Sequence, residues 1–187
     1  MAWRILLVSG SLRKASTNSA ALRTAIAHTP TDARPTMYDD AAELPHFNPD
    51  DDGDSLDSRV AALRGTVHDA DALLFSVPEY AGALPGSFKN VLDWLIGDDQ
   101  PRSISEKPVA WINVSPRGAA LAHESLRVVL TYANASIVED ACVAAPVPPN
   151  GVGPDGLIAD PASVAEIVRS LAALARHLAG PASGPQE

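Results

Sequence analysis

Ser9-Gly-Ser-Leu-Arg-Lys-Ala-Ser-Thr-Asn18 is the stretch that decides the fold of this chain of 187 residues. It follows an apolar run, Trp3-Arg-Ile-Leu-Leu-Val8, which predicts a buried strand over about residues 3–8. It leads into residues 18–28, whose apolar spacing predicts a helix. A short polar loop between a strand and a helix brings free backbone amides and the positive end of the helix dipole to one place. The stretch is therefore expected to hold an anion, and a phosphate is the expected ligand.

The side chains of this stretch support the phosphate interpretation. Arg13 can fork across two phosphate oxygens, and Lys14 adds a second cation. Four further side chains can donate hydrogen bonds: Ser11, Ser16, Thr17 and Asn18. The stretch has neither the GxxxxGK[ST] pattern of a P-loop nor the GxGxxG pattern of a dinucleotide fold, so neither a nucleoside triphosphate nor a tightly held NAD is expected. The alternative is that residues 16–18 only cap the first helix.

Strand-like and helix-like segments alternate along the rest of the chain. Further strands are predicted at 35–38, 71–77, 108–114 and 136–144, and further helices at 56–70, 85–96, 119–134 and from residue 160 or 163 to 178. Residues 39–54, which are acidic, and residues 145–160, which are rich in Pro and Gly, are predicted loops. Strict alternation predicts an α/β fold, a flavodoxin-like doubly wound five-stranded parallel sheet of order 2-1-3-4-5 with helices on both faces. We expect one domain over residues 1–180, followed by a flexible tail at 181–187.

Charge and cysteine content narrow the class of protein. The chain has 14 basic and 23 acidic residues, and the net charge of −9 disfavours nucleic acid or an anionic membrane as the main partner. No apolar run approaches the roughly 18 residues of a membrane span, and the first residues lack the pattern of a signal peptide. Cys142 is the only cysteine, which excludes an internal disulfide and fits a reducing compartment. We therefore expect a cytoplasmic protein in which Cys142 packs as a small hydrophobic side chain.

The predicted sheet brings two further loops to the edge that carries the phosphate loop. They are Pro78-Glu-Tyr-Ala-Gly-Ala-Leu-Pro-Gly86 and Ser115-Pro-Arg-Gly118. Prolines and glycines give the first loop a fixed backbone that can offer N–H and C=O groups to a flat heterocycle, with Tyr80 as an aromatic wall. The second loop can hydrogen-bond the opposite edge of such a ring. The alternative is that Tyr80 is a surface aromatic and Pro85-Gly86 only starts a helix.

Two stretches of the chain resemble the NADPH-dependent FMN reductase family of flavodoxin-like proteins. They are Gly10–Asn18 and Pro78-Glu-Tyr-Ala-Gly-Ala-Leu-Pro-Gly-Ser-Phe-Lys-Asn-Val-Leu-Asp-Trp94. The hallmarks of that family are a GSLRxxSxN loop and a PEYNxSxPGxLKNAIDW block. The similarity keeps order and spacing over about residues 4–118. It implies bound FMN, with NADPH or NADH as hydride donor and a quinone, azo compound, metal oxyanion or free flavin as small-molecule acceptor. It also implies a homodimer or homotetramer.

The resemblance further implies which residues bind the cofactor. The residues expected around the FMN phosphate are Ser11, Arg13, Ser16, Asn18 and Ser19. Those expected along the isoalloxazine are Pro78, Glu79, Tyr80 and Ala81, with Ser115 and Gly118 near its pyrimidine edge. No side chain is expected to be an obligatory acid or base, so the catalytic residues stay unknown. Tyr80 and Arg117 are candidates for shaping the acceptor pocket.

Two positions depart from the family pattern. Ala81 stands where asparagine usually follows Glu-Tyr, and Arg117 stands where glycine is commoner in the Ser-Pro-Gly turn. An arginine there could complement negative charge on the flavin or reach the phosphate of an incoming nucleotide. FMN binding is still expected, whereas redox tuning and the choice of acceptor stay open.

Two other functions are compatible with the same fold. A flavodoxin-type electron carrier would suit the net charge of −9, but the usual cation-poor phosphate loop of such carriers does not fit Arg13 and Lys14. A flavin-free binding domain is made more credible by Ala81.

Two short patterns indicate other chemistries and are set aside. Gly53-Asp-Ser-Leu56 matches the nucleophile block of a lipase-like hydrolase family, but no histidine in the chain has the expected aspartate three positions before it. The acidic run from Asn48 mimics the start of a calcium loop, but Arg59 stands at the twelfth position, where a bidentate Glu is needed. The histidines lack metal-ligand spacing, so no metal site is expected.

Overall fold

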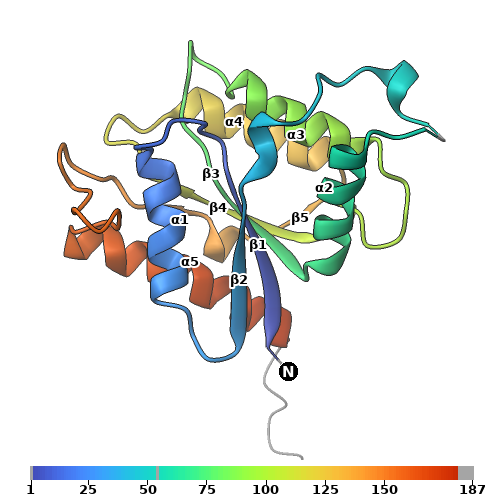
Figure 1. The fold of residues 1–187 in the computed structure, drawn as a ribbon. Helices are drawn as coiled ribbons and strands as arrows, with labels where there is room; N and C mark the ends of the chain where they lie inside the picture. Colours follow the sequence, from blue (N-terminus) through green and yellow to red (C-terminus); the bar gives the residue numbers. More distant parts are fainter. Residues whose placement is uncertain (1, 54, 181–187) are drawn as a thin grey trace, which may run out of the picture.

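The computed structural model describes residues 2–53 and 55–180, and its centre is a parallel sheet of order β2-β1-β3-β4-β5 (Figure 1). The strands are β1 Trp3–Ser9, β2 Ala33–Tyr38, β3 Ala72–Ser76, β4 Pro108–Asn113, β5 Ser136–Ile137 and β6 Val143–Ala144. This order confirms the predicted flavodoxin-like fold. β2 starts two residues earlier than predicted because its pairing with β1 begins at Trp3 and Ala33. The predicted tail at 181–187 lies outside the described residues.

Five α-helices cover the two faces of the sheet. They are α1 Thr17–Ala27, α2 Ser58–Asp69, α3 Gly86–Ile96, α4 Ala120–Tyr132 and α5 Pro161–Ala179. α1 and α5 lie on one face, and α2, α3 and α4 lie on the other (Figure 1). Side chains of β1 alternate between these faces, since Leu6 and Val8 belong to the core under α2–α4 while Ile5 and Leu7 belong to the core under α1 and α5. No helix within the described ranges is long and apolar enough to cross a membrane.

The predicted strand at 136–144 is interrupted in the structure. β5 pairs with the start of β4 and β6 with its end, and a 3-10 turn over Glu139–Ala141 separates them. The turn buries Ala141, whose carbonyl accepts a hydrogen bond of 2.6 Å from the hydroxyl of Ser170 in α5. A contact with a distant helix thus replaces strand pairing at the middle of this edge strand.

The predicted acidic loop at 39–54 is fastened to α3 over much of its length. It contains two 3-10 turns, Asp40–Ala42 and Pro49–Asp51. The carbonyl of Pro45 accepts hydrogen bonds from Asn90 Nδ2 and from Trp94 Nε1, both at 2.9 Å. The ring of Phe47 packs edge-on against that of Trp94, with ring centroids 4.9 Å apart. The second half of the Pro78–Trp94 motif therefore anchors this loop.

Candidate functional site

The loop after β1 crosses closely over the end of β3. The N–H of Gly10 donates to the carbonyl of Ser76 at 2.8 Å. A Cβ at Gly10 would lie 2.8 Å from Val77 Cγ1, so only glycine fits this approach. The buried hydroxyl of Ser76 lies 3.0 Å from Asn18 Oδ1 and 2.9 Å from the carbonyl of Ile112. These contacts fix the loop after β1 and the start of α1 against both β3 and β4.

The start of α1 presents free donors. The hydroxyl of Ser16 accepts a hydrogen bond from the N–H of Ser19 at 3.3 Å, which makes Ser16 the N-cap of this helix. Ser16 therefore caps the helix, and its role toward a phosphate stays a prediction. The backbone N–H groups of Thr17 and Asn18 and the guanidinium of Arg13 have no hydrogen-bond partner among the described residues. Among residues 2–53 and 55–180 no carboxylate pairs with Arg13, so the donor set suits a phosphate.

Other hydroxyl groups of the loop are engaged with the protein itself. The hydroxyl of Ser11 lies 3.5 Å from that of Tyr80 and accepts the N–H of Arg13 at 3.4 Å. The hydroxyl of Ser19 lies 2.8 Å from that of Ser9. Ser11 and Ser19 line a small adjoining cavity of about 180 Å³, and Arg13 borders both this cavity and a larger cleft.

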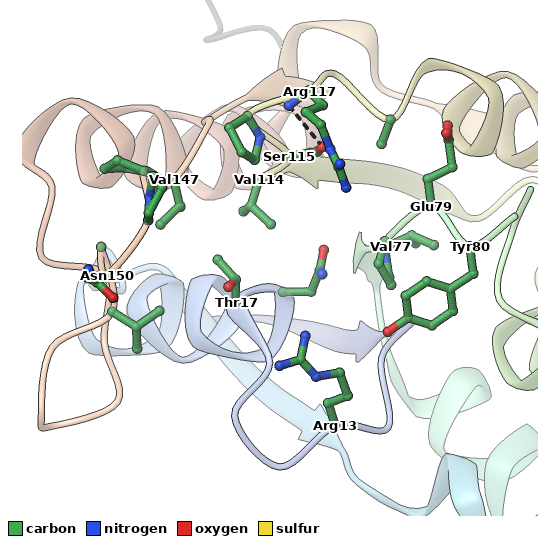
Figure 2. A pocket seen from close by; sticks show the side chains of 18 residues that line it. Arg13, Thr17, Val77, Glu79, Tyr80, Val114, Ser115, Arg117, Val147 and Asn150 are labelled. Carbon is green, nitrogen blue, oxygen red and sulfur yellow. Dashed lines mark hydrogen bonds between the residues drawn. The ribbon is translucent and has the colours of Figure 1, made fainter. Parts of the chain in front are cut away.

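The larger cleft, of about 580 Å³, lies where β1, β3 and β4 end (Figure 2). Tyr80 and Glu79 lie at one end of it, and Val147 and Asn150 lie at the other. Arg13 and Arg117 approach it from opposite sides. The cleft gathers eight of the residues named from the sequence: Arg13, Thr17, Asn18, Pro78, Glu79, Tyr80, Ser115 and Arg117. Six others do not line it: Ser11, Lys14, Ser16, Ser19, Ala81 and Gly118.

One wall of the cleft was missed by the sequence analysis. Residues 147–152, predicted only as part of a loop, line the end of the cleft away from Tyr80. The N–H of Val147 donates to the carbonyl of Val114 at 3.0 Å, which carries this segment past the end of β4. Apart from Asn150, this segment consists of valines, prolines and a glycine, none of which has a reactive group. Its sequence therefore gave no signal that it borders a site.

The turn after β3 is a tight two-residue hairpin. Tyr80 and Ala83 exchange two backbone hydrogen bonds, each of 3.1 Å. The two central residues, Ala81 and Gly82, have φ angles of 51° and 71°. This is the left-handed pairing of a type I′ turn, which Asn-Gly sequences favour. The departure at Ala81 therefore places a Cβ in a strained backbone conformation, and the side chain does not line the cleft.

Glu79 joins two of the loops around the cleft. Its Oε2 accepts a hydrogen bond of 3.1 Å from the N–H of Ala122, in the first turn of α4. Ala119, the N-cap of α4, has a φ of 44° and no side chain able to cap the helix. The carboxylate of Glu79 supplies that cap from the loop after β3, so the predicted cofactor residue has a positioning role.

Asn113 braces the turn after β4 and was not named from the sequence. Its Oδ1 accepts the N–H of Ser115 at 3.0 Å, and its Nδ2 donates to the carbonyl of Gly118. The hydroxyl of Ser115 in turn accepts the N–H of Arg117 at 3.3 Å. The side-chain amide of Asn113 thus holds both ends of the turn that carries Arg117. The signal for this role in the sequence is a polar residue at the end of a buried strand.

Burial shifts the pKa of two titratable groups near the cleft, Cys142 and His123. Burial raises the pKa of the Cys142 thiol to about 11, so the thiolate that a catalytic cysteine needs is disfavoured. Burial also lowers the pKa of His123, whose Nδ1 lies 2.9 Å from the carbonyl of Ala119 and therefore donates to it. Neither residue lines the cleft.

The acidic run that resembles the start of a calcium loop contacts helix α2. Asp52 pairs with Arg64 at 2.8 Å, and both side chains are largely buried. Among residues 2–53 and 55–180, no three His, Cys, Asp or Glu side chains gather as a metal site would require. Residue 54, in the middle of the Gly53–Leu56 block, lies outside the described residues.

The sequence pattern of the NADPH-dependent FMN reductase family matches residues 3–148 of this chain. The chain belongs to that family. It is 36% identical over 132 residues to an NAD(P)H-dependent FMN reductase of Pseudomonas aeruginosa, covering 69% of this chain and 70% of that protein. It is 30% identical over 190 residues to a probable NADPH:quinone oxidoreductase of Oryza sativa, covering 96% and 92%.

A solved structure agrees with this assignment. The flavoenzyme NAD(P)H:(acceptor) oxidoreductase FerB from Paracoccus denitrificans superposes with a TM-score of 0.76 and 25% identity, covering 95% of this chain and 97% of that one. The predicted family, the oxidoreductase class and the use of FMN with NAD(P)H are therefore confirmed. The matched pattern ends at residue 148, within the wall formed by residues 147–152.

The hairpin after β3 gives a stability prediction. Because asparagine tolerates the left-handed conformation better than alanine, Ala81→Asn should raise the free energy of unfolding by about 1 kcal/mol. Urea unfolding followed by circular dichroism measures this change. Gly82→Ala is the matched control and should lower the same free energy, because its φ of 71° is also left-handed. An Ala81→Asn protein no more stable than the parent would refute this account of the turn.

Proposed function

We propose that this protein reduces a quinone-type acceptor with NADPH or NADH as electron donor, using FMN bound in the cleft of about 580 Å³. The observation that carries the proposal is that the Arg13 guanidinium and the amides of Thr17 and Asn18, which lie together, have no partner in the described part of the chain. These donors supply a phosphate anchor in a chain whose net charge is −9. The quinone class is supported by the Oryza sativa relative, which is named as a quinone oxidoreductase. Bound FMN supplies the hydride-transfer chemistry, and the protein supplies orientation and electrostatics.

The proposed roles of the cleft residues follow from their contacts. Arg13, the amides at the start of α1 and the free Nδ2 of Asn18 would bind the phosphate. Pro78 and Tyr80 would lie along one side of the ring system, and Ser115 would face its other edge. Glu79 and Asn113 would hold the two ring-binding loops at a fixed separation. The remaining predicted residues would shape these loops without lining the main cleft. They are Ser11, Ser16, Ser19, Ala81 and Gly118.

Anaerobic reduction tests the proposed activity against an electron carrier. The purified protein, loaded with FMN, is mixed with NADPH and then with NADH in a stopped-flow spectrometer. We expect rapid loss of the flavin absorbance band, and its return when a quinone is added. A band that persists for minutes would assign the protein to the electron carriers instead. A colourless protein that takes up no added FMN would favour a flavin-free binding domain.

Removal of the phosphate anchor gives a second measurement. Arg13→Ala should weaken FMN binding by about 1.5–3 kcal/mol, the range for hydrogen bonds to charged groups. Fluorescence titration of the apoprotein with FMN measures the dissociation constant. Lys14→Ala removes a neighbouring cation that does not line the main cleft, and it should weaken binding much less. Equal losses in the two variants would mean that Arg13 acts only through the general charge of the loop.

We also propose that the protein forms a homodimer or homotetramer through α4. Leu121, Val128 and Tyr132 on this helix are 55%, 64% and 81% exposed. A Cβ placed on Gly82, in the hairpin beside the cleft, would lie 3.4 Å from Leu121 Cδ1, so the apolar face reaches the mouth of the site. A second copy of the chain would cover it, since isologous dimers pair the same patch on both subunits.

Light scattering after size-exclusion chromatography tests this interface. The parent protein should elute as a multiple of 19.5 kDa, and Val128→Glu should shift it to the monomer mass because a carboxylate would be buried in the contact. A parent protein that is monomeric at micromolar concentration would overturn the proposal.

We further propose that the protein is cytoplasmic, on the grounds of its single, half-buried cysteine.

A further inference from the structure

Arg117 has no ionic partner within the described chain. Its backbone N–H donates to Ser115 Oγ, which fixes the turn, while its guanidinium extends toward the cleft (Figure 2). Among residues 2–53 and 55–180, no carboxylate lies within salt-bridge distance of that guanidinium. Glu79, the acidic residue that lines the cleft, is engaged by the N–H of Ala122. The charge of Arg117 is therefore available to something outside the protein.

The proposed FMN phosphate does not require this charge. Arg13 and the start of α1 lie across the cleft from Arg117, on a different loop (Figure 2). A single phosphate anchored at α1 would already be served by Arg13 and the free amides there. The cleft thus holds two separate cationic side chains, and the exposed guanidinium of Arg117 is free to bind a second anion.

We propose that Arg117 is a specificity-determining residue that binds an anionic group on the substrate reacting at the cleft. This inference rests on the proposed function. The chemistry that the guanidinium would recognise is a phosphate, sulfonate or carboxylate held by a forked, charge-assisted hydrogen bond. Two sources supply such a group, namely the 2′-phosphate that distinguishes NADPH from NADH, and an acidic substituent on the quinone. The interaction forms equally before and during reaction, so it acts on KM more than on kcat.

Paired substrates separate these sources. The FMN-loaded parent protein and Arg117→Ala are assayed with NADPH against NADH, and with 1,4-benzoquinone against its sulfonate. We expect Arg117→Ala to lower kcat/KM about 10- to 100-fold for the member of one pair that carries the additional anionic group, mostly through KM, and to leave the other member within about twofold. A change confined to the nicotinamides identifies the 2′-phosphate, and a change confined to the quinones identifies the acceptor.

Binding measurements add a readout independent of turnover. If the 2′-phosphate is the ligand, calorimetry with 2′,5′-ADP and 5′-ADP should show that Arg117→Ala weakens only the 2′-phosphorylated compound. Arg117→Lys should keep part of the preference, because it retains the charge without the planar fork. Arg34→Ala is the matched control, since Arg34 is an exposed arginine at the start of β2, outside the cleft.

The result that overturns the inference differs from the one that overturns the proposed function. If Arg117→Ala binds FMN normally and is reduced normally, but neither substrate preference changes, Arg117 is not a specificity residue and the reductase assignment stands. If the parent protein is reduced by neither nicotinamide, the proposed function fails and this inference fails with it.

Discussion

The buried hydroxyl of Ser76 is the contact on which the architecture of the cleft depends. It lies within hydrogen-bond distance of Asn18 at the start of α1 and of the carbonyl of Ile112 in β4, while the carbonyl of Ser76 accepts the N–H of Gly10. Leaving such a buried group without a partner would cost about 1–3 kcal/mol. These bonds therefore fix the relative positions of three chain segments, and the loops that continue from them form three walls of the cleft.

The charge at the cleft differs in sign from the net charge of the molecule. Six arginines form ion pairs in the described chain: Arg4, Arg59, Arg64, Arg102, Arg127 and Arg169. Arg13 and Arg117, which approach the cleft from two sides, form none there. Since the net charge is −9, acidic partners are plentiful elsewhere on the chain. The lining of the cleft carries two cations, Arg13 and Arg117, against one carboxylate, Glu79, so the cleft can draw in anionic molecules despite the overall repulsion.

The order of the sheet and the family were predictable because they depend on local signals. The apolar runs define the strands, and two long motifs lie at the right separation. The interruption of the last strand was not predictable, because it depends on Ser170 in a helix about thirty residues further along the chain. The capping role of Glu79 was equally hidden, since its partner at Ala122 lies in a different loop-helix unit. Ser11 and Ser19 look like ligands in the sequence, but their hydroxyl partners are within the protein.

The contacts of Asn90 and Trp94 with Pro45 show that the Pro78–Trp94 motif has two parts with different structural roles. The first part shapes the cleft, whereas the second fastens a neighbouring segment to the scaffold. Natural selection can act on these parts separately, because loss of the cofactor would remove the need for the first but not for the second. The asparagine and the tryptophan therefore serve the packing of residues 39–53 on α3, whatever molecule the cleft holds.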